Sequence, residues 1–421
     1  MIMAKNFLYF QPEYVDKFKC DGSKCNARCC KGWTITIDDA TYKKYSQIKP
    51  KEKAEEILSC MKFDSERKEY VMTLKPNGFC PMLTEKNLCR LQANYGEKFL
   101  SKTCATYPRY TNQFGDFFER SLTLSCPVAA EMILFEEEPI KFFFVNVDEK
   151  VHSNGGKIFT NPFSTKKFLA EELFAIQGTM ISILQERRLS INQRLLALGF
   201  FVYDLEELMA VDVSSKEKSL ELVRAVKKLT ASYNPKIFLR EGVPPALEKF
   251  SFDAEKFVMI MISFFSPIYV GAFKSFDVLI KYLHGVVELL HIDSADKPRL
   301  TFKEIAENYT ALAGERKNFS EKFSTFLENY LVNEFFLNIC PWKFKGGVVK
   351  NFLVFMISYK VFELIIFSAT LKSFDTKEDL LCIVDRFTRT IDHNEELKKK
   401  ILEFLKDRND LFELTESLLE Q

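Results

Sequence analysis

The chain has 421 residues, of which 47% are hydrophobic, so it can bury a large core and is long enough for two or three domains. The 59 lysine and arginine residues almost balance the 58 aspartate and glutamate residues, which gives no reason to expect nucleic acid or a membrane as a partner. The first residues, MIMAKNFLYF, form no continuous apolar stretch of signal-peptide length, so we expect a cytoplasmic protein.

The segment 1–150 is interrupted by cysteine, proline and glycine, with only short helical patterns such as 40–48 and 51–61. Nine of the eleven cysteines lie before residue 127, and all four histidines lie after it. In a cytoplasmic chain, thiols that cluster in this way are more often metal ligands than disulfides. We therefore expect a small, loop-rich module that a thiolate-bound metal holds together.

Eight of these cysteines follow an ordered pattern: C-x4-C-x3-CC-x-GW, then CPxL, a single cysteine, CxxYPR and SCP. They are the predicted metal ligands: Cys20, Cys25, Cys29, Cys30, Cys80, Cys89, Cys104 and Cys126. Eight thiols exceed the needs of one four-ligand site, so two sites, or one site with additional structural or redox thiols, both fit the count. Iron–sulfur clusters and structural zinc can each take four cysteines, so ligand identity does not separate them. The radical-enzyme spacing C-x3-C-x2-C is absent, and a radical mechanism has no direct support.

The segment 151–421 is predicted to form a large α-helical domain that makes the substrate and partner contacts. The boundary is placed at HSNGGK, residues 152–157, because turn-forming residues coincide there with a loss of periodicity. Apolar residues then recur at helical spacing, and capping boxes mark helix starts at Ser190, Ser214 and Thr301. The expected fold class is therefore mainly α, with the cysteine module preceding the helices.

The most apolar stretch of the chain, 352–371, needs a separate interpretation because its length suits a membrane span. It carries Lys360 and Glu363, two charges that would be costly near the centre of a bilayer. We therefore predict a buried helix at this position.

The cysteine motifs, in this order, resemble the flagellin lysine N-methylase family. The segments 94–104, NYGEKFLSKTC, and 329–334, NYLVNE, extend the resemblance over most of the chain. More distantly, the double cysteine and the later cysteine blocks look like a broad family of zinc or iron chelators. One position departs from the pattern, since Val128 stands where the family often has glutamate.

The resemblance implies transfer of a methyl group from S-adenosylmethionine to lysine side chains of flagellin, with a 4Fe–4S iron–sulfur cluster in the enzyme and zinc as the alternative metal. Such an enzyme has to present the lysine as a neutral amine. A glycine-rich G-x-G-x-x-G loop is absent, which excludes an ordinary Rossmann-type methyltransferase. The competing interpretation is a non-catalytic zinc- or iron-binding protein whose helical domain binds a partner protein.

Three residues near the cysteine motifs are candidates for the site. Trp33 is interpreted as a cofactor contact, stacking on adenine or facing the sulfonium, or else as a shield for the metal. Arg109 either clamps a carboxylate or ribose of the cofactor or fixes its loop through a salt bridge. Tyr107 either orients the incoming amine or packs with a satisfied hydroxyl.

Four further polar residues complete the candidates. Asn329 and Asn333 are separated by one helical turn and would present both amides on one face, where they are assigned to cofactor binding. Glu119 and Glu334 are the candidate catalytic bases.

Overall fold

The structure is a computed structural model, and it describes residues 6–22, 25, 28–114, 117–149, 158–160, 170–210, 215–274, 279–291 and 300–420. The chain forms two compact units. The first, the N-terminal unit, comprises Met1–Gln113, Phe117–Met132 and Lys141–Phe159. The second, the helical unit, comprises Phe114–Asp116, Ile133–Ile140 and Thr160–Gln421. The predicted boundary at 152–157 and the predicted cap at Ser214 lie outside the described residues.

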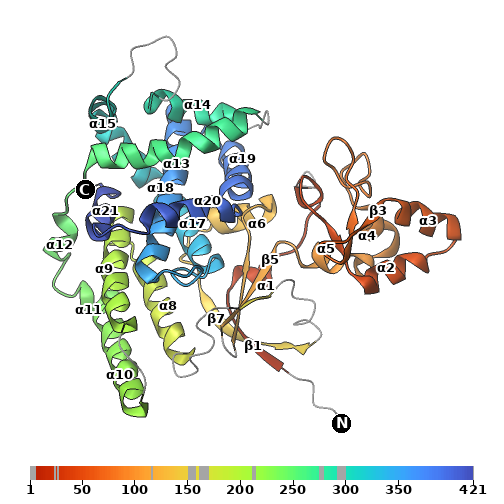
Figure 1. The fold of residues 1–421 in the computed structure, drawn as a ribbon, viewed down its shortest axis with the longest axis horizontal. Helices are drawn as coiled ribbons and strands as arrows, with labels where there is room; N and C mark the ends of the chain where they lie inside the picture. Colours follow the sequence, from red (N-terminus) through yellow and green to blue (C-terminus); the bar gives the residue numbers. More distant parts are fainter. Residues whose placement is uncertain are drawn as a thin grey trace. The chain divides into compact units, whose positions relative to one another are not determined.

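The N-terminal unit contains a five-stranded sheet in the order β7-β1-β6-β5-β8 (Figure 1). Its strands are β1 (Asn6–Pro12), β5 (Arg109–Phe114), β6 (Phe117–Leu122), β7 (Phe142–Asp148) and β8 (Ile158–Thr160). Strand β1 is antiparallel to β7 and parallel to β6, where Tyr9 is opposite Phe118.

The expectation of a small, loop-rich N-terminal module did not include this sheet. Five consecutive residues of β6, from Phe118 to Leu122, are buried. Because both faces of the strand are covered, the alternation of polar and apolar residues that identifies a half-buried strand is missing.

The cysteine motifs lie mostly in a separate part of the N-terminal unit, which we call the cysteine module, residues 28–107. It contains a three-stranded sheet in the order β2-β4-β3, formed by β2 (Thr36–Ile37), β4 (Glu69–Met72) and β3 (Met61–Asp64). The helices and 3₁₀ turns are η1 (Arg28–Cys30), α2 (Asp39–Ser46), α3 (Lys51–Ser59), α4 (Arg90–Tyr95), η2 (Glu97–Phe99) and α5 (Lys102–Thr106). Helices α2 and α3 lie where the short helical patterns were predicted. Two short helices, α1 (Tyr14–Lys17) and α6 (Pro127–Leu134), lie outside the module.

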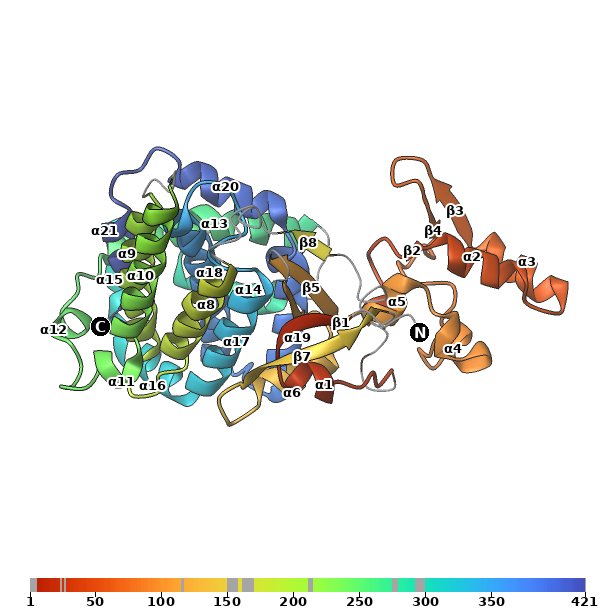
Figure 2. The same ribbon diagram turned by 90° about the horizontal axis from the view of Figure 1, so that it is seen from below.

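The helical unit confirms the prediction of a mainly α-helical C-terminal part (Figures 1 and 2). Its first helices are α8 (Ala170–Leu184), α9 (Ile191–Met209), α10 (Lys216–Ser232), α11 (Pro235–Phe238), α12 (Pro245–Glu248), α13 (Ala254–Lys274) and α14 (Ile280–Leu289). They are followed by α15 (Phe302–Ala311), α16 (Ala313–Lys322), α17 (Ser324–Leu337), α18 (Val348–Leu371), α19 (Lys377–Phe387), the π-helical turn η5 (Thr388–Asp392), α20 (Glu395–Leu405) and α21 (Leu411–Ser417).

Two of the predicted capping boxes are present. The Ser190 hydroxyl accepts a hydrogen bond from the backbone N–H of Gln193 at 3.2 Å, and the Gln193 side chain accepts one from the N–H of Ser190 at 2.9 Å. Thr301 and Glu304 make the same reciprocal pair at the start of α15. Each box satisfies two N–H groups that a helix start leaves without an intrahelical partner.

Helix α18 is the buried helix that the sequence predicted. It packs against α9, α13, α14, α17, α19, α20 and α21. The ammonium of Lys360 is compensated inside the unit, because it lies 2.6 Å from a Glu363 carboxylate oxygen and 2.7 Å from the Asn192 side-chain oxygen. Among the described residues, two helical segments have the length and apolarity of a membrane span, Ala254–Gly271 and Val348–Leu371. The second is 89% buried within the fold, so its apolarity is explained by packing.

A buried ion pair joins α9 to α17. Both side chains of the pair are almost inaccessible, and the Arg194 guanidinium donates to Glu328 at 2.7 Å. Arg187, which is partly exposed, donates to the same carboxylate at 2.9 Å. Glu328 therefore compensates two cations in the core of the helical unit.

Candidate functional site

The N-terminal unit encloses a cavity of about 330 Å³, which we call the cysteine cavity. Six of the eight predicted metal ligands line it: Cys20, Cys29, Cys30, Cys80, Cys89 and Cys104. The other two, Cys25 and Cys126, are buried outside the described lining of the cavity. The fold thus brings together thiols that are up to 84 positions apart, from Cys20 to Cys104.

Local backbone contacts hold the loops that carry these thiols. The backbone N–H of Cys80 donates to the carbonyl of Cys30 at 2.7 Å, which joins the double-cysteine turn to the CPxL loop. Cys89 directly precedes α4 and forms a β-bridge with Leu83. Cys104 lies in α5, where its N–H donates to the Ser101 hydroxyl at 3.2 Å.

Several thiols of the cavity are costly to ionise in the folded chain. Burial raises the pKa of Cys104 to about 12 and that of Cys80 to about 11, and neighbouring cysteines add to both shifts. The pKa of Cys30 is raised first by its hydrogen bond with Cys29, whose sulfur is 3.7 Å away, and then by burial. A bound metal cation favours thiolates, so it would offset these costs.

The donor set therefore fits an iron–sulfur cluster or zinc in its chemistry, since both are bound by thiolates. Among the described residues, no three cysteine, histidine or carboxylate side chains meet closely enough to hold one ion. The cysteine cavity is thus a shared compartment for the thiols, whose sulfur atoms would have to turn towards a common centre to bind metal.

The three aromatic and basic candidates also line the cysteine cavity: Trp33, Tyr107 and Arg109. The indole N–H of Trp33 donates to the Cys29 carbonyl at 2.8 Å, and its ring centroid is 6.1 Å from that of Tyr107. The Tyr107 hydroxyl is 3.1 Å from the Ser125 hydroxyl. The structure thus places these candidates beside the thiols, as the sequence analysis proposed, and gives the Tyr107 hydroxyl a local partner.

Arg109 is, with Lys19, one of the two cationic residues in the described lining of the cavity. Its guanidinium lies 5.1 Å from the Phe18 ring centroid, and it donates a long hydrogen bond of 3.4 Å to the Phe18 carbonyl. Burial lowers its pKa, and the nearby Arg120 cation lowers it further. No carboxylate among the described residues forms a salt bridge with Arg109, so its charge is available to an anionic ligand.

Glu119 lies elsewhere. It is buried on β6, opposite Phe10 of β1, and is outside the described lining of the cysteine cavity. The sequence analysis did not name the other polar residues of the lining, which are Lys19, Tyr45, Gln92, Glu97 and Ser101. The available signal was the segment 94–104 of the family resemblance, which contains Glu97 directly after Gly96, a glycine with a φ of 84°.

The remaining three candidates are buried on α17 in the helical unit. The Asn329 amide donates to the Glu136 carbonyl at 2.7 Å, and Asn333 donates to a Glu334 carboxylate oxygen at 3.2 Å. Asn329 therefore anchors the segment 133–140, while Asn333 orients Glu334. Of these three, Glu334 lines a cavity described below.

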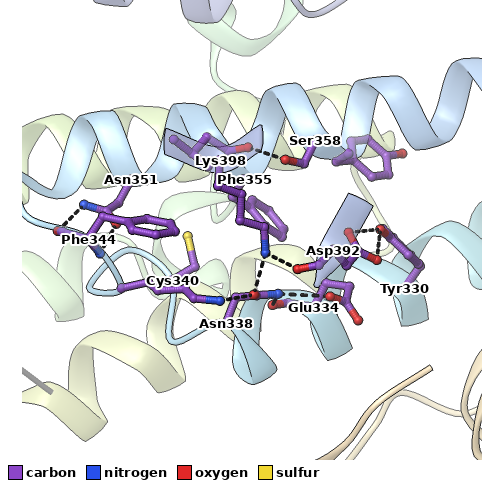
Figure 3. Close-up of a pocket in the computed structure, with 13 residues that line it drawn as sticks. Tyr330, Glu334, Asn338, Cys340, Phe344, Asn351, Phe355, Ser358, Asp392 and Lys398 are labelled. Atoms are coloured by element: carbon purple, nitrogen blue, oxygen red, sulfur yellow. Dashed lines mark hydrogen bonds between the residues drawn. The ribbon is translucent and has the colours of Figure 1, made fainter. Parts of the chain in front are cut away.

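This second cavity has a volume of about 30 Å³, and we call the polar groups around it the α17 network (Figure 3). Asn338 donates to Glu334 at 2.9 Å and accepts from the Lys398 ammonium at 3.0 Å. Lys398 also donates to the Asp392 carbonyl at 2.6 Å, and Tyr330 donates to the Asp392 carboxylate at 3.1 Å. Helices α17 and α20 and the π-helical turn thus share one hydrogen-bonded system.

Burial perturbs the titration of the α17 network. It raises the pKa of Glu334 to about 8, with the charge of Asp392 as the second cause. It lowers the pKa of Lys398 to about 8, with the charge of Lys343 as the second cause. The sequence analysis did not find Lys398, because it begins a run of three lysines, 398–400, that is typical of a solvated surface.

Comparison with known proteins gives the family of the chain. Residues 177–419, more than half of the chain, match the FliB lysine N-methylase C-terminal domain. The chain belongs to the FliB lysine N-methylase family. The matched segment of this FliB-family chain lies within the helical unit and includes the α17 network. The recognition made from the sequence motifs is thereby confirmed.

Individual relatives agree with this result. The lysine-N-methylase of Salmonella typhimurium is 28% identical over 211 residues, which cover 49% of this chain and 50% of that protein. The lysine-N-methylase of Salmonella choleraesuis has the same identity and coverage. The flagellar biosynthetic protein FliU of Salmonella muenchen is 35% identical over 133 residues, 31% of this chain and 79% of that protein. The FliB-family chain thus spans about half the length of the two lysine-N-methylases, and no solved structure matches it.

Proposed function

We propose that this FliB-family chain is a protein-lysine N-methyltransferase that transfers a methyl group from S-adenosylmethionine to lysine side chains of flagellin. The observation that carries the proposal is the family match over the helical unit. The names of the relatives support it, since two are lysine-N-methylases and one is a flagellar biosynthetic protein. In this reaction the sulfonium S–CH₃ bond breaks and an N–CH₃ bond forms, so the lysine has to lose its ammonium proton.

The cysteine cavity is our proposed binding site for an iron–sulfur cluster and for the methyl donor. Six thiols line it together with Arg109, which has no carboxylate partner among the described residues, and this supports the assignment. A [4Fe–4S] cluster bound by these thiols would supply an iron that can ligate the amino and carboxylate groups of S-adenosylmethionine. The chain itself supplies Trp33 for the sulfonium or the adenine, and Arg109 for the carboxylate.

Among the three proposed catalytic residues, Glu334 is best suited to accept the proton of the lysine. Its pKa of about 8 is close to the working pH, which is where a general base is most effective. Tyr107 has its hydroxyl next to Ser125, and Glu119 is buried within the sheet. Glu334 is buried too and accepts hydrogen bonds from Asn333 and Asn338, so all three residues would have to be freed from their surroundings before they reached an amine.

The substitution Arg109→Gln is expected to weaken binding of S-adenosylmethionine roughly 10- to 100-fold, because a charge-assisted hydrogen bond to a carboxylate contributes about 1.5–3 kcal/mol. Titration calorimetry on anaerobically purified protein measures the Kd. Binding of 5′-methylthioadenosine, which has no carboxylate, should be unchanged. Arg67→Gln, an exposed arginine paired with Asp64, serves as the control. If Arg109→Gln weakened the binding of both ligands equally, the assignment of Arg109 to the carboxylate of S-adenosylmethionine would be contradicted.

The test of the proposed function is anaerobic purification, followed by an absorption spectrum, metal analysis and a methyl-transfer assay on flagellin read by mass spectrometry. We expect a brown protein with about four irons per [4Fe–4S] cluster, a spectrum that changes on adding S-adenosylmethionine, and methylated flagellin lysines. A colourless zinc protein that neither binds the cofactor nor methylates flagellin would overturn the proposal and favour a metal-binding protein with a partner-binding helical unit.

A further inference from the structure

The N-terminal unit holds a buried arginine, Arg120 on β6, whose charge has no carboxylate partner. Its side chain belongs to a residue that is only 7% exposed. Two other arginines among the described residues are buried to a similar degree, and each donates to a carboxylate at 2.7 Å: Arg194 to Glu328 and Arg316 to Glu420. No salt bridge joins Arg120 to a carboxylate in the part of the chain that the structure describes. A buried cation normally has a counter-charge, so Arg120 favours an anionic ligand at this position.

The free donors of Arg120 lie on one edge of its guanidinium. Its Nε and Nη2 atoms are buried and have no hydrogen-bond partner among the described residues. The N–H bonds on this edge are parallel, and such a pair matches the two oxygens of one carboxylate. Arg188 uses the same edge in this protein, since its Nε and Nη2 donate to the two carboxylate oxygens of Glu186 at 2.8 and 2.9 Å. The geometry of the free edge therefore suits a planar carboxylate better than a single-atom anion such as chloride.

The surroundings of Arg120 fix the orientation of its guanidinium. The central carbon lies 4.3 Å from the centroid of the Tyr9 ring. Tyr9 is fully buried on β1, and its ring stacks on that of Phe118 at 5.2 Å. Stacking on an aromatic face leaves the edge of a guanidinium free to donate. Glu119, the preceding residue, points to the other face of the strand, because successive side chains of a strand alternate. The edge of Arg120 is thus held in place without a counter-charge from its neighbour.

Arg109 provides a second cation for the same ligand. It begins β5, which is the neighbour of β6 in the sheet. The charge of Arg120 is the second cause, after burial, that lowers the pKa of Arg109, so the two guanidinium groups are close enough to repel each other. Arg109 also lines the cysteine cavity. An anion that bound near both groups would relieve their repulsion and the missing counter-charge of Arg120.

We propose that Arg120 and Arg109 form a binding site for the carboxylate group of a small ligand. Arg120 donates the two parallel hydrogen bonds, and Arg109 contributes the second charge from the wall of the cysteine cavity. The inference rests on the proposed function in one respect, since it assigns this carboxylate to the amino-acid part of S-adenosylmethionine. The site itself requires no methyl transfer, so a free carboxylate such as acetate is a suitable probe.

The first experiment measures thermal unfolding of the full chain, purified anaerobically, in sodium acetate and in sodium chloride of equal concentration and pH. Acetate at about ten times its Kd is expected to raise the midpoint by roughly 2–4 °C over chloride, because it binds only the folded state. Arg120→Met should abolish this difference. Arg67→Met, which changes an exposed arginine paired with Asp64, should keep it. The absence of an acetate effect in the unsubstituted protein, or its persistence in Arg120→Met, would overturn the inference.

The second experiment uses the unsubstituted protein and therefore does not depend on how a variant folds. Titration calorimetry measures the Kd of S-adenosylmethionine and of 5′-methylthioadenosine at increasing acetate concentrations. We expect acetate to raise the apparent Kd of S-adenosylmethionine in proportion to its concentration and to leave that of 5′-methylthioadenosine unchanged. Arg120→Met should weaken binding of S-adenosylmethionine roughly 10- to 100-fold, with no effect on 5′-methylthioadenosine.

The outcomes of the two experiments separate this inference from the proposed function. If acetate stabilised the chain through Arg120 but did not compete with S-adenosylmethionine, the assignment of the carboxylate to the methyl donor would be overturned. If S-adenosylmethionine did not bind at all while the acetate effect depended on Arg120, the proposed function would fail and the carboxylate site would stand. Competition in a chain that transferred no methyl group to flagellin would likewise count against the proposed function alone.

Discussion

Replacement of Glu328 by alanine is expected to lower the free energy of unfolding by about 3–5 kcal/mol, because it leaves a buried guanidinium without a counter-charge. Arg194 is 3% exposed and donates to Glu328 at 2.7 Å. Its other donors reach only backbone carbonyls, those of Leu189 at 2.9 Å and Leu184 at 3.1 Å. These carbonyls satisfy hydrogen bonds but leave the net charge of Arg194 uncompensated.

Urea unfolding followed by circular dichroism measures this effect. Asp375→Ala is a matched control, since Asp375 forms a more exposed ion pair of the same length, 2.7 Å, with Lys322. This substitution should lower the free energy of unfolding by about 1 kcal/mol or less, as for other surface pairs. Glu328→Gln should lower the free energy of unfolding by an intermediate amount, because the amide oxygen still accepts a hydrogen bond. A change below about 1 kcal/mol for Glu328→Ala would mean that Arg194 finds water or another partner after the substitution.

The contribution of Glu334 to stability is expected to fall as the pH rises from about 5 to about 8, against an opposite contribution from His393 below about pH 6.5, and Glu334→Gln is expected to remove it. The pKa of Glu334 is about 8 in the folded chain and about 4.5 when exposed. Between these values the folded state retains a proton that the unfolded state has released, so the stabilising contribution is full below pH 4.5 and lost towards pH 8. One such group contributes a slope of at most about 1.4 kcal/mol per pH unit.

The neighbours of Glu334 determine the rest of the profile. The pKa of Asp392 is also raised by burial, so Asp392 contributes in the same direction as Glu334. Lys398 has a folded pKa of about 8 against an ordinary 10.5, so above pH 8 the folded state has released a proton that the unfolded state still holds. Its contribution makes stability rise again with pH. Tyr330, Asn338 and Lys343 also line the cavity around Glu334. Because the contributions of Glu334 and Lys398 have opposite slopes on the two sides of pH 8, we expect a minimum of stability near pH 8.

Urea midpoints at pH 5, 6.5, 8 and 9.5 measure the profile. Glu395→Gln is the control, because Glu395 is half exposed and pairs with Lys343 at 2.8 Å at the edge of the same network. The stability of this variant should depend on pH between 5 and 8 in the same way as that of the unsubstituted protein. If Glu334→Gln also left the pH dependence of stability unchanged, the buried carboxyl would not be the group that binds the extra proton.

Several features of this chain could be predicted from local sequence patterns. The capping boxes at Ser190 and Thr301 depend on side chains three residues apart, so they form locally wherever a helix starts with this pair of residues. The buried helix at 352–371 was predicted correctly because Lys360 and Glu363 excluded the membrane interpretation and the remaining residues are apolar on every face. The order of the cysteine motifs was enough to recognise the family, which the match over residues 177–419 then established through the helical part.

The candidate site could be predicted only in part. Trp33, Tyr107 and Arg109 were found because they are next to cysteines in the sequence, and they line the cysteine cavity. Gln92 and Glu97 line the same cavity but belong to none of the cysteine motifs, so residue type alone did not mark them as site residues. The placement of Glu119 away from the cavity follows from the strand pairing of β6 with β1, which joins residues more than 100 positions apart.

The family, the helical character of the C-terminal part and the chemistry of the thiols follow from the sequence, because they depend on residue type and short spacing. Tertiary structure decided the five-stranded sheet, the grouping of the cysteines and the α17 network. In each case the deciding contacts are long-range: β1 pairs with β6, Cys30 meets Cys80, and Lys398 meets Asn338. The burial that these contacts create also sets the pKa values of the thiols, Glu334 and Lys398, since desolvation depends on the whole surrounding fold.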